Sequence, residues 1–416
     1  MKINLNQNCW YGDEKVQIDF PEDWEVEYHG LEGDACSELS DEQIREKINS
    51  PYGMKSLAEL ARDRKEVAIV FDDISRGTPV KKIAEIVLEE LHAAGISEKN
   101  VRFICALGTH GAHTRIDFEK KLGSDIVRKY PVFNHNSYEN CVEIGRTKRD
   151  FPVLINEEFM KCDLKIGIGA VTPHPFNGFG GGGKMLFPGI ASIDTIQQNH
   201  ATAVDSLEKS GINPITGMGN INNRGMREEI EEMTKMVGEF FKIDVIYNSK
   251  LEIVDLYAGD AVEEYYASID SAKKLYGTSR PKEKDVVVVN ANAKANEAAI
   301  ALFFGAMGVS GKGGDLVLVN HTPTGQITHY LFGAFGKTTG GRMWSRLPVE
   351  LPHINRIIYY TPYPDYSSAM WFGDPERITW ATTWQEVMDI IGDNGKGTKV
   401  SVIADGTIQY YKENND

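Results

Sequence analysis

The sequence contains few cysteines and lacks a long hydrophobic run. Its 416 residues include five cysteines, which are Cys9, Cys36, Cys105, Cys141 and Cys162. Their odd number and wide spacing, without a Cys-x-x-Cys pair, argue against a disulfide framework or a cysteine zinc site. No apolar run approaches the roughly 20 residues that cross a bilayer, and the N-terminus lacks the pattern of a secretory signal. We therefore expect a cytoplasmic protein with reduced thiols and no membrane association.

Basic side chains are also in the minority. The chain has 60 acidic and 45 basic residues, which gives a formal net charge of −15. This balance argues against nucleic acid as a partner, and an anionic substrate would need cations placed locally. The hydrophobic content of 41% is that of an ordinary globular protein. The length predicts two domains, because single cores stop growing at roughly 250 to 300 residues.

Apolar strand-like runs alternate with amphipathic helical segments from residue 67 onward. Residues 67–72, 101–107 and 164–170 are predicted strands, and residues 79–96 are a predicted helix. Continuous apolar strands separated by amphipathic helices are typical of a buried parallel sheet. The pattern predicts a first α/β domain over residues 1–275.

A second set of such elements follows a basic, proline-containing linker near residues 277–284. Its predicted strands are residues 286–290, 316–320, 356–360 and 399–404, and its predicted helices are residues 296–307 and 384–391. The sequence therefore predicts two tandem α/β domains with mainly parallel sheets. The second domain would span residues 285–416, and the active site would lie in the cleft between the two domains.

Polar clusters follow four of the predicted strands. In order they read FDDISRGTP, GTHGAHT, TPHP and NANAKAN, and they contain Arg76, His110, His174 and Lys294. Ligands of open α/β sheets collect beyond the carboxyl ends of the strands. These clusters are therefore candidate parts of a functional site.

The first two clusters each allow two interpretations. Arg76 offers a planar fork for a carboxylate or phosphate, but it could instead pair with Asp73 on the surface. His110 directly follows a strand, and an imidazole that titrates near neutrality suits proton exchange with a hydroxyl group. Alternatively, His110 and His113 form an H-x-x-H zinc site, for which no third ligand is near in sequence.

Four consecutive glycines, Gly180 to Gly183, precede Lys184. They leave the backbone open to a planar or phosphorylated group, which the lysine amine could also meet. The spacing from Gly178 to Lys184 matches a phosphate-binding P-loop, but Met185 replaces the Ser or Thr that would hold magnesium. A tight turn with a solvated lysine is the structural alternative. His200, sixteen positions later, is expected to lie within a helix.

Together these residues resemble the nickel-dependent lactate racemase family, which includes a broader group of 2-hydroxyacid racemases and epimerases. The family pattern is close to P-H-x-x-x-G-[FY]-[SG]-G-G-x-K-x-x-x-P-G, followed by T-I-x-x-N-H. The matching residues here are Pro173, His174, Gly178, Phe179, Gly180, Gly181, Gly182, Lys184, Pro188, Gly189, Thr195, Ile196, Asn199 and His200. The resemblance extends to Asp73, Ser75, Arg76, the Gly-Thr-His element ending at His110, and Lys294, so it covers both predicted domains.

The resemblance implies a covalently attached nickel cofactor. The lysine matching Lys184 would carry a nickel pincer nucleotide, pyridinium-3-thioamide-5-thiocarboxylic acid mononucleotide, whose ring carbon and two sulfurs hold nickel. The histidine matching His200 would supply the fourth ligand, as suits a tetragonal nickel centre. The other residues expected to contact the nucleotide are Asp73, Gly180, Gly181 and Gly182. Loading would require separate cofactor-synthesis proteins.

The implied reaction is racemisation or epimerisation of a 2-hydroxycarboxylic acid by removal and return of the Cα hydride. Residues matching His110 and His174 would act as general bases for opposite enantiomers. Arg76 and Lys294 would hold the carboxylate of this small-molecule substrate.

Two departures from the family pattern border the expected substrate pocket. Gly77 replaces proline, and Ala293-Lys294-Ala295 replaces the usual proline, lysine and aspartate. Hydroxy acids other than lactate, including sugar acids, therefore remain candidate substrates. The alternatives to this function are a non-catalytic small-molecule or nucleotide sensor and a zinc-dependent hydrolase.

Overall fold

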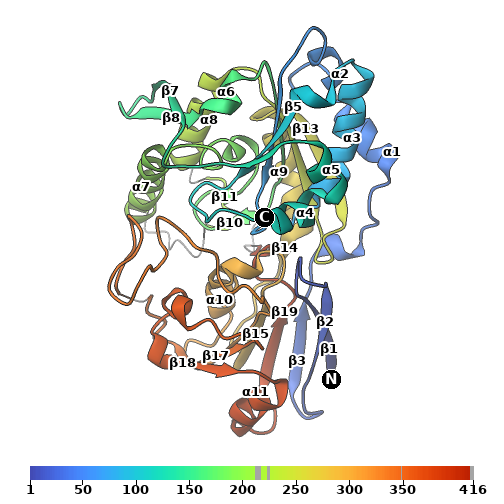
Figure 1. Cartoon of the computed structure of the whole chain (residues 1–416). Helices are drawn as coiled ribbons and strands as arrows, with labels where there is room; N and C mark the ends of the chain where they lie inside the picture. Colours follow the sequence, from blue (N-terminus) through green and yellow to red (C-terminus); the bar gives the residue numbers. More distant parts are fainter. Residues whose placement is uncertain (211–216, 223–224, 348, 413–416) are drawn as a thin grey trace. The chain divides into compact units, whose positions relative to one another are not determined.

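The computed structural model forms two compact units. Residues 1–210, 217–222, 225–347 and 349–412 are described below (Figure 1). Unit 2 spans Cys36–Leu275, and unit 1 combines Met1–Ala35 with Tyr276–Asp416. The first predicted domain, residues 1–275, differs from this division at its N-terminal end. The physical reason is that an early strand, β3 (Glu25–His29), pairs with β19 (Lys399–Ile403) late in the chain.

Unit 2 contains a six-stranded sheet in the order β13-β12-β9-β4-β5-β6. Neighbouring strands are parallel except for the edge strand β13, which is antiparallel to β12. The strands are β4 (Val67–Asp72), β5 (Val101–Ala106), β6 (Val132–Asn134), β9 (Leu164–Ala170), β12 (Phe241–Tyr247) and β13 (Ile253–Asp260). Short pairs add β7 (Cys141–Arg146) with β8 (Pro152–Asn156) and β10 (Pro173–His174) with β11 (Gly178–Phe179).

The helix α3 (Val80–Ala93) illustrates why the helices of unit 2 form. Its buried residues, such as Ile83, Val87 and Leu91, recur at three- and four-residue spacing and cover one face. The helix ends before Gly95, whose φ of 92° suits a glycine. The other helices are α1 (Asp41–Ile48), α2 (Leu57–Leu60), α4 (Arg115–Leu122), α5 (Ser124–Lys129), α6 (Glu157–Lys161), α7 (Ile193–Ser210), α8 (Gly225–Val237) and α9 (Glu263–Tyr276).

Unit 1 contains a six-stranded parallel sheet in the order β18-β17-β16-β15-β19-β3. Its remaining strands are β15 (Val286–Asn290), β16 (Gly314–Val319), β17 (Ile354–Tyr360) and β18 (Ile378–Ala381). Additional elements are the antiparallel pair β1 (Lys2–Gln7) and β2 (Glu14–Asp19), the short pair β14 (Gly277–Thr278) and β20 (Tyr410–Tyr411), and helices α10 (Ala299–Ala306) and α11 (Trp384–Ile391).

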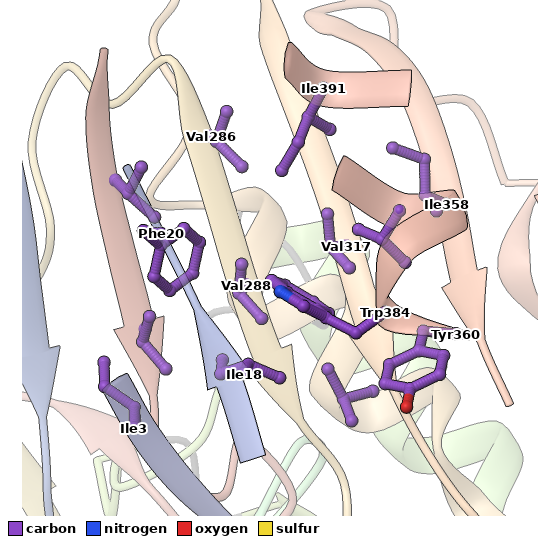
Figure 2. Close-up of a cluster of buried hydrophobic side chains, with 14 of the residues drawn as sticks. Ile3, Ile18, Phe20, Val286, Val288, Val317, Ile358, Tyr360, Trp384 and Ile391 are labelled. Atoms are coloured by element: carbon purple, nitrogen blue, oxygen red, sulfur yellow. The ribbon is translucent and has the colours of Figure 1, made fainter. Parts of the chain in front are cut away.

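The main core of unit 1 lies on one face of this sheet (Figure 2). Val288 from β15 and Ile358 from β17 belong to one buried cluster with Ile18 from β2 and Trp384 from α11. On the opposite face of β15, Val289 approaches Gly305 of α10. Because successive strand residues point to opposite faces, the run of valines in β15 places apolar side chains in the packing layers on both faces of the sheet.

The predicted mixed α/β fold with mainly parallel sheets is confirmed. The predicted strands at residues 67–72, 164–170 and 286–290 match β4, β9 and β15 in full, and the helix predicted at 384–391 matches α11. All five cysteines are free, as expected, and Cys105 is buried in β5. Within the described residues, no helix is long and apolar enough to cross a membrane.

Truncation of Ile358, which is fully buried in the core of unit 1, should destabilise the protein. We expect Ile358→Ala to lower the free energy of unfolding by about 2–5 kcal/mol, because it removes buried methyl groups and leaves a cavity. Urea unfolding measures this loss. The matched control Ile116→Ala, at a residue 65% exposed, should change it by less than about 0.5 kcal/mol. Equal effects of the two substitutions would contradict this description of the core.

Candidate functional site

Three strand-end loops of unit 2 meet at one edge of its sheet. Strand β4 pairs in parallel with β5 on one side and with β9 on the other. The carboxyl ends of parallel strands lie at the same edge, so the loops that follow these three strands are neighbours. The chain also reverses its winding direction at β4, which is where open α/β sheets bind ligands. The polar clusters around Arg76, His110 and His174 therefore belong to one region.

Asp73 and His110 form a buried carboxylate–imidazole pair. Asp73 Oδ2 lies 2.5 Å from His110 Nδ1, and both side chains are less than a tenth exposed. Burial favours the neutral carboxyl, but the charge and hydrogen bond of His110 outweigh it and hold the pKa of Asp73 well below its usual range. The pair fixes Nδ1 as the protonated ring atom when His110 is neutral, so Nε2 is the basic atom.

The other oxygen of Asp73 is also engaged within the protein. Asp73 Oδ1 accepts hydrogen bonds from the backbone and hydroxyl of Ser75. Arg76 Nη1 donates to Ser75 Oγ at 2.8 Å, so Arg76 is connected to Asp73 through Ser75. The guanidinium of Arg76 is partly buried at the strand end. The predicted contact of Asp73 with a cofactor and that of Arg76 with a carboxylate stay predictions.

Lys121 binds the loop that follows β4 through its ammonium group. The sequence did not indicate this role. The buried Lys121 Nζ lies 2.7 Å from Asp72 Oδ1 and donates to the carbonyl oxygens of Arg76 and Thr78, each at 3.0 Å. A single ammonium therefore binds three points of the loop between β4 and α3. This lysine lies in α4, and its sequence neighbours Lys120 and Glu119 gave no sign of a buried ion pair.

His113 supports the same loop through its ring. Its Nε2 accepts a hydrogen bond from the amide of Ile74 at 3.0 Å, and its backbone exchanges two hydrogen bonds with Asn134. Burial lowers the pKa of His113, which favours the neutral ring that accepts this bond. No group of three or more His, Cys, Asp or Glu residues in the described part of the chain could hold a metal ion. This arrangement gives no support to the zinc site considered for His110 and His113.

The glycine run forms a turn that packs closely against unit 2. Gly182 N donates to Asp244 Oδ2 at 2.6 Å, and Arg227 donates to the carbonyl oxygens of Gly181 and Phe179 at 3.0 and 2.8 Å. A Cβ at Gly181 would lie 2.8 Å from Asp244 Oδ2, and one at Gly182 would lie 2.6 Å from the carbonyl oxygen of Ala261. Both glycines also have positive φ. Their lack of side chains is therefore required by the protein's own packing.

Gly180 differs from the glycines that follow it. A Cβ there would make only ordinary contacts, the nearest at 3.6 Å to the carbonyl oxygen of Thr172, and its φ is not positive. The fold itself does not require a glycine at this position. Among the three predicted cofactor-binding glycines, Gly180 is therefore the exception.

Lys184 lies beside His174. The lysine Nζ is 2.9 Å from His174 Nε2, and His174 Nδ1 accepts a hydrogen bond from the amide of Phe176 at 3.2 Å. Both residues follow β9: His174 lies in the hairpin β10-β11, and Lys184 lies in the 3-10 turn that continues the glycine run. The hairpin folds His174 back over the lysine that follows ten positions later.

His200 lies in the same region, within α7 as predicted. Its Nδ1 donates to the carbonyl of Ile196 at 2.9 Å, which makes Nε2 the lone-pair atom of the neutral ring. Burial, with the positive charge of Lys184 as a second cause, lowers the pKa of His200 to about 4. The electrostatic effect of Lys184 on His200 indicates that the two side chains share one neighbourhood.

A backbone hydrogen bond joins the His110 loop to the segment after Lys184. Gly108 N donates to Gly189 O at 2.8 Å, and a Cβ at Gly108 would meet the carbonyl oxygen of Pro188 at 3.4 Å. Gly108 has a φ of 54°, which suits a glycine. The Asp73–His110 pair and the lysine are thus parts of one connected region of unit 2.

Lys294 belongs to unit 1, where it follows β15. Its backbone N donates to Thr407 Oγ1 at 3.2 Å, and the preceding residue, Ala293, donates to Asp405 Oδ2 at 2.7 Å. Its side chain is 2% exposed. Like Arg76 in unit 2, Lys294 lies beyond the strand at which its sheet reverses winding direction.

The chain is similar to known lactate racemases. A family model described as the lactate racemase N-terminal domain matches residues 11–211. The lactate racemase of Thermoanaerobacterium thermosaccharolyticum is 26% identical over 287 residues, which span 67% of this chain and 65% of the relative, just under two thirds of its length. The lactate racemase of Lactiplantibacillus plantarum is 24% identical over 397 residues, or 89% and 91% of the two chains.

Two solved structures have a similar fold. The lactate racemase apoprotein of T. thermosaccharolyticum gives a TM-score of 0.74 at 20% identity, covering 99% of this chain and 100% of that one. A crystal structure of a protein from Thermotoga maritima gives a TM-score of 0.65 at 19% identity, covering 90% and 99%. These structural likenesses show the fold.

Replacement of Asp73 should lower stability in a pH-dependent way. The folded-state pKa of Asp73 is depressed, so its ionised form stabilises the folded protein above about pH 4, and this contribution falls as pH drops below that value. We expect Asp73→Asn to cost about 1.5–3 kcal/mol at pH 7 and less near pH 3, measured by urea unfolding. The exposed control Asp125→Asn should change stability little at either pH. A constant difference for Asp73→Asn between pH 7 and pH 3 would contradict the ionised pair.

Proposed function

Because the chain belongs to the lactate racemase family, we propose that it is a racemase or epimerase of a 2-hydroxycarboxylic acid. The observation that carries this proposal is the arrangement of Lys184, with His174 2.9 Å away and His200 within its electrostatic influence. An amine beside one imidazole, with its charge acting on a second, would provide an attachment point, a base and a metal ligand. The Asp73–His110 pair, on the loops that follow β4 and β5, adds a second base.

The residues around Lys184 fit a nickel pincer nucleotide. Lys184 would carry the group through a thioamide bond, and His200 would ligate the metal through Nε2, since Nδ1 donates to Ile196 O. The neutral ring that ligation requires is favoured because burial lowers the pKa of His200. Gly180 offers backbone that a flat ring can approach. When bound, this group would supply the hydride acceptor for the Cα hydrogen of the substrate.

Attachment at Lys184 would also change the local charge. A thioamide at Nζ carries no positive charge, so the repulsion that Lys184 exerts on a protonated His200 would disappear. The same change would remove an ammonium from beside His174 Nε2. The ammonium of Lys184 would then no longer act on either imidazole. Cofactor-synthesis proteins would be the partners that load the group.

His110 and His174 are the proposed bases for the two enantiomers. Asp73 orients the His110 ring, so its Nε2 can take the proton from the substrate hydroxyl and later return it. The amide of Phe176 donates to His174 Nδ1, so this ring is also held in orientation, but its Nε2 carries the proton of the neutral ring and is the atom that would exchange a proton with the substrate. A reaction that inverts one carbon requires bases that serve each enantiomer, and two separately held imidazoles meet this need.

Arg76 and Lys294 are the proposed ligands of the substrate carboxylate. Each is the cation that follows the reversal strand of its own sheet. The guanidinium of Arg76 is held by Ser75, whose hydroxyl also contacts Asp73. A carboxylate bound by Arg76 would therefore lie close to the base His110, as proton transfer from the neighbouring hydroxyl requires.

Two substitutions separate attachment of the cofactor from turnover. When the chain is produced with the cofactor-synthesis proteins, we expect Lys184→Ala to lose the added mass, whereas His110→Ala should keep it and lose at least a hundredfold in exchange of Cα hydrogen. Intact mass spectrometry and a panel of Cα-deuterated 2-hydroxy acids measure the two effects. The exposed control Lys148→Ala should keep both.

An unmodified Lys184 in the loaded wild type would contradict the proposal. Ligand binding without any Cα exchange across the panel would favour a non-catalytic sensor instead. Wild-type exchange by His110→Ala would remove His110 as a base.

Replacement of the proposed metal ligand should separate the nucleotide from its metal. We expect His200→Ala to keep the covalent mass of the nucleotide on Lys184 but to bind nickel at least tenfold more weakly, because one donor is lost. Nickel per chain, measured by elemental analysis after dialysis, reports this effect. Full nickel retention in His200→Ala would contradict the assignment.

A further inference from the structure

Polar atoms without hydrogen-bond partners lie on the loop of Lys294 and on the loop that follows the neighbouring strand β16. Among the described residues, Asn292 Oδ1, Asn296 Oδ1 and His321 Nε2 are buried and have no hydrogen-bond partner. Asn292 is 4% exposed and His321 is 7% exposed. Buried polar atoms nearly always have hydrogen-bond partners in folded proteins, so these three atoms are unsatisfied and each could bind a polar group of a ligand. We call Asn292, Lys294, Asn296 and His321 the Lys294 cradle.

The members of the cradle lie on two loops that follow neighbouring strands. Strands β15 and β16 are parallel partners, with Asn290 opposite Val319, so residues 291–296 and His321 emerge at the same edge. Asn320 Nδ2 donates to the carbonyl oxygens of Ala291 and Ala295, both at 2.9 Å. One side chain thus connects the loop that carries the asparagines with the loop that carries His321.

Further hydrogen bonds hold these loops in place. Gln326 Oε1 accepts from Ala298 N at 2.8 Å, and Ile327 N donates to the carbonyl of Asn296 at 2.8 Å. From the opposite neighbour of β15, Asp405 and Thr407 bind the backbone of Ala293 and Lys294. The backbone of the cradle is therefore fixed on both sides, so a ligand would meet loops that are already ordered.

The unpaired atoms select for hydroxyl groups. An amide oxygen accepts hydrogen bonds, so neither a carboxylate nor a methyl group can satisfy Asn292 Oδ1 or Asn296 Oδ1. A hydroxyl group both donates and accepts, and it would satisfy either end of an asparagine amide. Burial lowers the pKa of His321 to about 4, so its ring is neutral and suits a hydroxyl as well. Lys294 provides the charge for the carboxylate of the same molecule.

We infer that the Lys294 cradle binds carboxylic acids that carry hydroxyl groups beyond the one at C2, in preference to lactate. The inference rests on the proposed function for the place of the carboxylate at Lys294. Lactate has a methyl group at C3, which would leave the asparagine oxygens unpaired. A polyhydroxylated acid brings donors to them, and a site built to bind a hydroxyl discriminates strongly against an analogue that lacks it.

Glycerate and lactate provide a matched pair of probes, because they differ by one hydroxyl group at C3. We expect the full chain, without cofactor, to bind glycerate about tenfold or more tightly than lactate in calorimetric titrations, and gluconate at least as tightly as glycerate. Equal affinity for glycerate and lactate, or no binding of either glycerate or gluconate, would overturn the inference.

Substitutions within the cradle test the assigned atoms. We expect Asn292→Leu and His321→Phe each to weaken glycerate binding about tenfold with little effect on lactate, whereas Lys294→Met should weaken both acids. Asn296→Leu, at a less buried residue, provides a variant that should fold if Asn292→Leu does not. The exposed control Asn136→Leu should change neither affinity. Equal losses for glycerate and lactate in Asn292→Leu and Asn296→Leu would overturn the inference.

These titrations use neither nickel nor turnover, so they separate the inference from the proposed function. Preferential glycerate binding by a chain that, once loaded, exchanges no Cα hydrogen would support the cradle and contradict the racemase. Cα exchange of lactate alone, together with equal binding of lactate and glycerate, would support the racemase and contradict the cradle.

Discussion

The parallel pairing of β4 with both β5 and β9 is the constraint on which the candidate site depends. It brings the loops of Asp73, His110 and His174 to one edge of the sheet, although these residues are far apart in sequence. Local contacts then complete the geometry: Lys121 fixes the first loop, and Gly108 joins the second to the segment after Lys184. A change in strand order would separate the imidazoles without altering any single motif.

The strands were predictable where their composition was uniform. Strands β4 and β15 are buried on both faces, so each reads as an apolar run that is typical of a central parallel strand. Strand β12 was missed because Lys242 and Asp244 interrupt its pattern. These two side chains are fully buried and lie 2.5 Å apart, and a sequence does not reveal that two such charges neutralise each other inside a sheet.

The candidate site was only partly predictable for a similar reason. The family resemblance predicted Lys184, His174 and His200 as site residues, but the Asp73–His110 contact depends on how two strands pair. For the glycine run, the sequence suggested a role that the packing of the protein already explains. We expected its bare backbone to serve a cofactor, yet Gly181 and Gly182 are needed for contacts with Asp244 and Ala261, which come from distant parts of the sequence.

The placement of β3 in the sheet of unit 1 has a consequence for how the protein is made. Gln409 binds the carbonyl of His29 across 380 residues, and β3 has no partner in that sheet until β19 has been synthesised. Unit 2, which is continuous from Cys36 to Leu275, can fold on the ribosome long before that. The early strand must therefore stay unpaired during translation, and chaperones that shield exposed strand edges would matter most for unit 1.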